Sequence, residues 1–176
     1  MSSFGIFQPN VLSGMGGRES SVQQKIRMII SWIWVFAPFV ILVLGSTVYR
    51  PTKEAGACVP WRPTSEMYGI TWGILCLFLS ISWIAVCGKA PFPAFVCIAL
   101  LFALVIALSV TWLGVYYNND KKPAMSVLVG ILLLVVILVP VAFQLNVWSG
   151  ALLCPLFMWL VLQIAVGASE LSCAEI

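Results

Sequence analysis

The chain contains no histidine and very little charge. Of its 176 residues, 9% are charged and 62% are hydrophobic, whereas soluble domains carry about 25% charged residues. Without histidine the chain lacks the commonest metal ligand and general base, and its six cysteines show no CxxC spacing typical of a metal site. We therefore expect no metal site and no enzymatic activity. The net charge of +3 is too small to indicate a nucleic-acid partner.

The long apolar segments lack charge, apart from Glu66 at the first residue of the second segment. A helix needs about 20 apolar residues to cross a membrane core of about 30 Å, and five segments satisfy this: 28–48, 66–87, 92–117, 124–145 and 148–169. Because intramembrane charges mark ion paths and proton relays, their absence argues against a pump. Residues 146–149 leave room only for a tight hairpin between the last two segments. We predict an all-α integral membrane protein, a bundle of five transmembrane helices surrounded by membrane lipids.

The predicted five-helix domain covers residues 25–170. It lies between an N-terminal tail, flexible or interfacial, at 1–24 and a short C-terminal tail at 171–176. Five spans place the termini on opposite sides of the membrane and place Cys58 and Cys173 on the same side, so a disulfide between them is topologically allowed. Lys and Arg number four on the N-terminal side and five on the other, which fixes no orientation. Arg18 and the serines of the tail leave an organellar membrane, mitochondrial or plastid, as one expectation.

Tryptophan is abundant, with eight residues. Trp32, Trp34 and Trp148 lie near span ends, as expected for an interfacial belt. Steps of three and four residues place the following residues on shared helix faces: Trp72, Cys76, Leu79 and Trp83 in the second span, Ser109, Trp112 and Tyr116 in the third, and Pro155, Trp159 and Gln163 in the fifth. Ordinary helix packing also favours small residues on such faces. The alternative is a shared pocket in which the indoles stack on a flat ligand.

The loop before the second span is stiff and aromatic. It reads CVPWRPTSEMYGITW, from Cys58 to Trp72. Pro60 and Pro63 restrict the backbone on both sides of Trp61. A stiff loop at the mouth of a bundle can hold an indole over a cavity at small entropic cost, so we predict that Trp61 caps the pocket.

Three motifs resemble those of the translocator protein family, also called tryptophan-rich sensory proteins or peripheral benzodiazepine receptors. The loop and second span are similar to the family pattern W-x-P-P-x-x-x-F-G-x-x-W. The resemblance extends over about residues 28–169 and rests on the segments WRPTSEMYGITW, SVTWLGVYY and GALLCPLFMW. Four positions depart from the family pattern, where Thr64, Ser109, Leu156 and Gly167 stand in place of proline, asparagine, tyrosine and asparagine.

The resemblance implies a five-helix membrane protein that binds porphyrins, sterols and related flat apolar compounds, for transport or sensing. It implies a cavity that opens toward the loop at residues 49–66. A porphyrin, sterol, lipid or pigment is the candidate bound molecule. With the residues of the three helix faces, the candidate ligand-binding set is Trp61, Trp72, Cys76, Ser109, Trp112, Tyr116, Trp159 and Gln163.

A second interpretation is a structural accessory subunit of a larger organellar or energy-transducing membrane complex. Spans without charge suit a bundle whose role is to pack against partners. Ala103, Ser126 and Gly130 are small and predict close approach of helices, either in a homodimer or within such a complex. A tetraspan junction protein fits less well, because those proteins have four spans and a long loop with paired cysteines.

Overall fold

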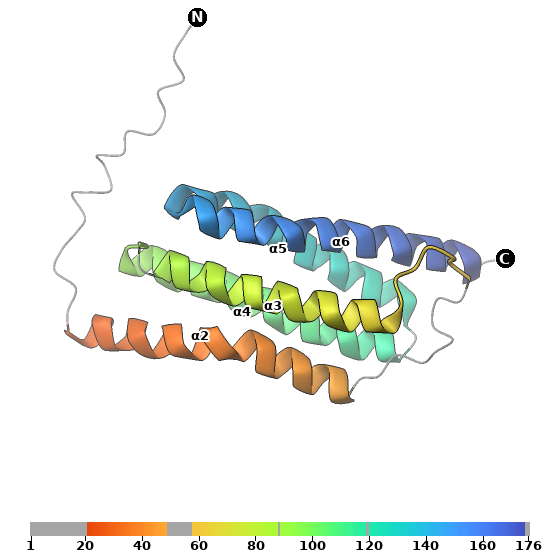
Figure 1. Ribbon diagram of the computed structural model, residues 1–176, viewed down its shortest axis with the longest axis horizontal. Helices are drawn as coiled ribbons and strands as arrows, with labels where there is room; N and C mark the ends of the chain where they lie inside the picture. The colour runs from red at the N-terminus through yellow and green to blue at the C-terminus, as the bar shows by residue number, and fades with distance from the viewer. Residues whose placement is uncertain (1–20, 49–57, 88, 119, 175–176) are drawn as a thin grey trace, which may run out of the picture.

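The computed structural model describes residues 21–48, 58–87, 89–118 and 120–174. These residues form five helices: α2 (Ser21–Val48), α3 (Ser65–Cys87), α4 (Phe92–Tyr117), α5 (Lys121–Leu145) and α6 (Val147–Ala174). Short connections join the last four, which run antiparallel along one bundle axis (Figure 1). Even 23 residues of helix extend about 35 Å at 1.5 Å per residue, enough to cross a bilayer core.

All five helices are long and apolar enough to cross a membrane, which confirms the predicted fold class. The bounds of α3 and α4 agree with the predicted spans to within one residue. The first and last helices are longer than predicted. α2 begins at Ser21, and α6 continues through Ala174, so residues 171–174 are helical and not part of a tail. Of the predicted tail at residues 1–24, residues 21–24 are helical, and residues 1–20 lie outside the described residues.

The helix limits follow from local chemistry. α4 begins directly after Pro91, with Pro93 in its first turn, where proline's fixed backbone angle suits a helix start. α5 and α6 are separated by Asn146 alone, whose backbone is extended. The Asn146 side-chain oxygen accepts a hydrogen bond from the backbone N–H of Trp148 at 3.1 Å, and this contact stabilises the tight hairpin that the sequence predicts.

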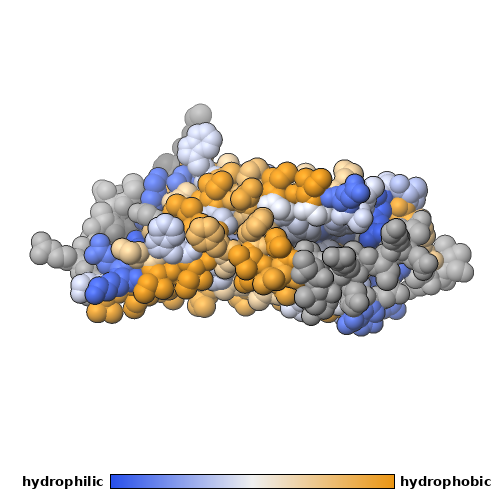
Figure 2. All heavy atoms as spheres, turned by 60° about the horizontal axis from the view of Figure 1, so that its bottom comes forward, coloured by the Kyte–Doolittle hydropathy of each residue, from blue (hydrophilic) through white to orange (hydrophobic). Residues whose placement is uncertain are grey.

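The five helices pack in a ring, in which α5 and α6 share the most extensive contact. α2 contacts α3 and α4, whereas α6 contacts α3 and α5 contacts α4. In Figure 1, α2 lies at one edge, α3 and α4 lie in the middle, and α5 and α6 lie at the opposite edge. α2 is consequently the least buried of the five helices. Figure 2 shows hydrophobic residues over the middle of the α2 face and hydrophilic ones toward both ends, as a membrane-spanning bundle requires.

An aromatic core lies away from the loop that precedes α3. Trp83 is 1% exposed and packs on Phe95 and Phe102 at ring-centroid distances of 5.4 and 5.2 Å. Trp34 contacts Trp83 edge-on at 6.1 Å, so its face points into the bundle, and its place in the interfacial belt stays a prediction. Position near a span end does not decide which way a helix face points. Trp32 and Trp148 are largely exposed.

Two polar contacts join helices within this apolar bundle. The Ser82 and Ser149 hydroxyls lie 2.7 Å apart and link α3 to α6, a contact whose net contribution in a membrane bundle is about 1 kcal/mol. Arg27 donates to the carbonyl oxygens of Cys87 and Ala90 at 3.0 and 2.7 Å. It thereby supplies hydrogen bonds to the C-terminal end of α3 and fastens α2 to the α3–α4 connection.

Candidate functional site

The candidate site lies where the loop before α3 meets the ends of α4 and α6. Thr64 is the N-cap of α3, because its hydroxyl accepts from the backbone N–H of Met67 at 3.3 Å. A second proline at this position would lack that hydroxyl, so the substitution relative to the family pattern has a local structural role. The cap fixes the start of α3 and the path of the loop residues just before it.

Four aromatic residues of the site form two ring contacts that involve α3, α4 and α6. Trp72 and Trp112 lie with ring centroids 6.2 Å apart. The Tyr68 and Trp159 rings meet edge-on at 5.5 Å. Tyr116 extends the first pair, stacking on Trp112 at 5.3 Å. Each contact lies within the range of favourable aromatic geometry, so three helices are joined at this end by aromatic side chains.

Gln163 links the two ring pairs. Its side-chain oxygen accepts hydrogen bonds from the indole N–H groups of Trp72 at 3.1 Å and Trp159 at 2.8 Å. The carboxamide takes this orientation because the opposite one would turn its NH₂ group toward two donors. Gln163 is 3% exposed, and a buried amide oxygen needs such partners. The predicted faces of the second and fifth spans therefore meet through one shared acceptor.

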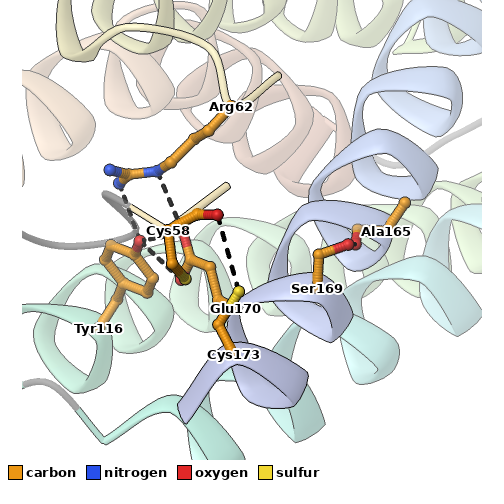
Figure 3. A network of polar contacts seen from close by, with 7 residues as sticks. All are labelled: Cys58, Arg62, Tyr116, Ala165, Ser169, Glu170 and Cys173. Carbon is orange, nitrogen blue, oxygen red and sulfur yellow. Dashed lines mark hydrogen bonds and ion pairs between the residues drawn. The ribbon is translucent and has the colours of Figure 1, made fainter. Parts of the chain in front are cut away.

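A buried ion pair closes the site toward the loop (Figure 3). Arg62 Nε lies 3.1 Å from Glu170 Oε1, and Glu170 is 1% exposed. Arg62 Nη2 donates to the Tyr116 hydroxyl at 2.8 Å, and this hydroxyl donates to both carboxylate oxygens at 3.1 Å. The guanidinium also lies over the rings of Tyr68 and Tyr116. Charge, hydrogen bonds and cation–π contacts thus hold the loop against α4 and α6.

A small cavity adjoins this network. Its volume is about 20 Å³, room for a water molecule and far below the roughly 300–1,000 Å³ of sites that hold small molecules. The indole and phenol rings therefore occupy the space that a flat ligand would need. The lining residues are Tyr68, Trp112, Tyr116, Lys121, Ala124, Met125, Leu128, Gln163, Val166, Gly167 and Glu170.

Trp112 lines this cavity and carries a buried hydrogen-bond donor without a partner in the described part of the chain. It is 5% exposed, and its indole nitrogen has no partner among the residues that the structure describes. A buried polar group without a partner costs about 1–3 kcal/mol. Trp112 lines the cavity, so a bound molecule with an acceptor atom would relieve that cost.

The structure separates the predicted site residues into two groups. Trp72, Trp112, Tyr116, Trp159 and Gln163 come together as described. The other three do not join them. Ser109 is buried and donates to the Val105 carbonyl of its own helix. Cys76 is buried and does not line the cavity, and Trp61 is 50% exposed and does not line it either. A ligand-binding role for any of these residues stays a prediction.

Sequence reasoning missed Arg62, Tyr68, Lys121 and Glu170. Glu170 was detectable, because it continues the face of Trp159 and Gln163 by steps of four and three residues. The predicted span ends at residue 169, whereas the helix continues through Ala174 and carries this carboxylate within its last two turns. Arg62 lay in the noted loop beside Trp61, but nothing local showed which side chain turns inward.

Five membrane-spanning helices, with a tryptophan-rich cluster at one end, define a small multi-pass integral membrane protein. The family model described as TspO/MBR family matches residues 34–169. The chain therefore belongs to the TspO/MBR family, and the resemblance to the translocator protein family is confirmed. No match to a curated protein was found.

Proposed function

We propose that this protein binds a flat apolar molecule with a hydrogen-bond acceptor among Trp72, Trp112 and Trp159, for transport or sensing. A porphyrin, a sterol or a related lipid or pigment fits this description. The observation that carries the proposal is the buried indole N–H of Trp112, which lines a cavity and has no acceptor among the described residues. The aromatic faces around it offer stacking surface for a planar ring system.

The small cavity makes binding conditional on opening. A ring system as large as a porphyrin enters only if aromatic side chains separate, and the loop that carries Arg62 is the segment that closes this end. The Arg62–Glu170 pair holds that loop against α6, so opening breaks this pair first. The protein thus exchanges its ligand through an opened state that the ion pair disfavours.

Charge at the site favours a ligand with an acidic edge. Lys121 lines the cavity, and Arg62 borders it through Tyr116. Glu170 is the acidic residue that faces them. Two cations beside one carboxylate leave net positive charge near the rim, which attracts a carboxylate such as those of many porphyrins. A neutral sterol would gain no affinity from this positive charge.

Replacing Trp112 with phenylalanine tests the unused donor. The stacking surface remains but the N–H is lost, so we expect porphyrin affinity to fall about fivefold, which corresponds to about 1 kcal/mol for a net hydrogen bond. Stability without ligand should change little, because the lost ring area is offset by removal of an unpaired polar group. Quenching of tryptophan fluorescence by added porphyrin measures the affinity.

Trp72→Phe is the matched control. The Trp72 N–H already donates to Gln163. Its loss should therefore lower stability slightly and reduce porphyrin affinity less than Trp112→Phe does. Equal affinity losses in the two variants would contradict a specific role for the Trp112 donor.

The second candidate function is a structural subunit, and the wide exposed apolar face of α2 favours it. We also propose association through helix faces, as a homodimer or within a larger complex. The ligand-binding function predicts that the chain purifies from membranes by itself, as a monomer or dimer. Light scattering during size-exclusion chromatography in mild detergent measures this. Recovery only together with other proteins would favour the subunit role.

A further inference from the structure

We propose that Cys58 and Cys173 form a reversible disulfide that locks the loop before α3 onto the end of α6. The sulfur of Cys173 lies 3.7 Å from the backbone carbonyl oxygen of Cys58, across 115 residues of sequence. Figure 3 shows both residues beside Arg62, Tyr116 and Glu170. Neither cysteine is bonded to another in this structure.

The positions of the other four cysteines leave Cys58 and Cys173 as the pair suited to thiol–disulfide exchange. Cys76 and Cys87 are buried in the bundle. Cys97 is exposed and Cys154 is partly exposed, but both belong to membrane-spanning helices, where lipid surrounds the exposed surface. Cys58 lies in an exposed loop, and Cys173 lies at the end of α6. Five spans place these two on the same side of the membrane, where one redox environment reaches both.

The reaction needs an oxidant, for which a small disulfide such as oxidised glutathione suffices. The thiolate of one cysteine attacks the glutathione disulfide, forms a mixed disulfide and releases one glutathione thiolate. The thiolate of the other cysteine attacks the protein sulfur and releases the second. The two protein thiols lose two electrons and two protons, and oxidised glutathione gains them.

The bond would act on the contact that closes the candidate site. Cys58 precedes Arg62 by four residues, and Cys173 follows Glu170 by three. A covalent bond there holds the loop on α6 even when the ion pair opens. If the proposed ligand function holds, oxidation slows ligand entry and release. The bond itself requires no ligand, so the two proposals fail separately.

The test uses the full chain in nanodiscs, equilibrated with oxidised glutathione and then treated with an alkylating reagent. Mass spectrometry of the digested protein should show Cys58 linked to Cys173, with the loss of two hydrogens and of alkylation at both. Dithiothreitol should break the Cys58–Cys173 bond and restore alkylation of both residues. Cys97→Ser is the matched control and should leave the linked pair unchanged. Cys58→Ser should abolish the link and leave Cys173 carrying glutathione.

Two results would overturn the proposal. One is glutathione attached separately to Cys58 and Cys173 in the unsubstituted chain, with no bond between them. The other is a dominant bond between chains or one that includes Cys97. Because both are read on the unsubstituted protein, poor folding of a variant cannot hide them. Porphyrin release, measured before and after oxidation, then shows separately whether the lock affects a ligand.

Discussion

Replacing Arg62 with alanine is expected to destabilise the protein by about 3 kcal/mol or more. The substitution removes the cation that faces Glu170, whose side chain is 2% exposed and cannot turn to water without unwinding the end of α6. Removing one partner of a buried ion pair costs about 3–5 kcal/mol, because the other charge stays buried without compensation. The Tyr116 hydroxyl would remain as a donor to the carboxylate, which places the expected loss at the lower end of this range.

Glu170→Gln should cost less, about 2 kcal/mol. The amide keeps the shape of the carboxylate, and Arg62, whose side chain is 18% exposed, can reach water when its partner is neutral. Because the two residues form one network, the double variant should lose less than the sum of the single losses. Unfolding in a denaturing detergent, followed by circular dichroism, measures these differences.

Lys89→Ala is the control for loss of a positive charge. Lys89 is exposed near the opposite end of the bundle, and such surface changes usually stay within about 0.5 kcal/mol. Two results would show that the ion pair does not hold the loop. One is a double variant whose loss of stability equals the sum of the losses for Arg62→Ala and Glu170→Gln. The other is a loss of stability in these variants no larger than that of Lys89→Ala.

Replacing Trp159 with alanine is expected to weaken binding of a flat apolar ligand about tenfold or more. Stacking by one indole contributes roughly 0.5–1.5 kcal/mol beyond burial, and 1.4 kcal/mol is a factor of ten. The structure adds a second reason. Trp159 contacts Tyr68 and donates to Gln163, so its loss also frees two residues that hold the site in order. A porphyrin titration followed by tryptophan fluorescence measures the change.

Trp32→Ala is the matched control, since it removes the same side chain from a position that is 63% exposed. Porphyrin affinity should stay nearly unchanged. Similar losses in both variants would mean that alanine acts through general destabilisation, and the aromatic cluster would then be a packing feature.

Much of the fold could be predicted because proline and charge mark the ends of apolar segments. Pro91 and Pro93 set the start of α4, and Asn146 sets the hairpin between α5 and α6. The end of α6 was missed for an energetic reason. A carboxylate is costly in a membrane, so a membrane-spanning helix that continues through Glu170 is not expected from the sequence alone. The cation that pairs with Glu170 is Arg62, which is 108 positions earlier in the chain. Residue spacing within one helix cannot predict such a pair.

The candidate site could be predicted only in part for a related reason. Spacing by three and four residues places Trp72 and Trp159 on faces of their own helices, and those faces do meet. Spacing cannot give the rotation of each helix in the bundle. Trp34 therefore packs on Trp83, and Ser109 bonds to its own helix. Nor can spacing show that the rings fill the pocket that they were expected to line.

The most direct test of the proposed function is a titration of the purified protein in nanodiscs with a porphyrin, followed by tryptophan fluorescence. Binding among Trp72, Trp112 and Trp159 predicts quenching that saturates at a single porphyrin per chain and shifts to higher porphyrin concentration in Trp159→Ala but not in Trp32→Ala. Quenching that rises without saturation and is the same in all three proteins would mean that the porphyrin only dissolves in the lipid. That result would contradict a ligand site in this bundle.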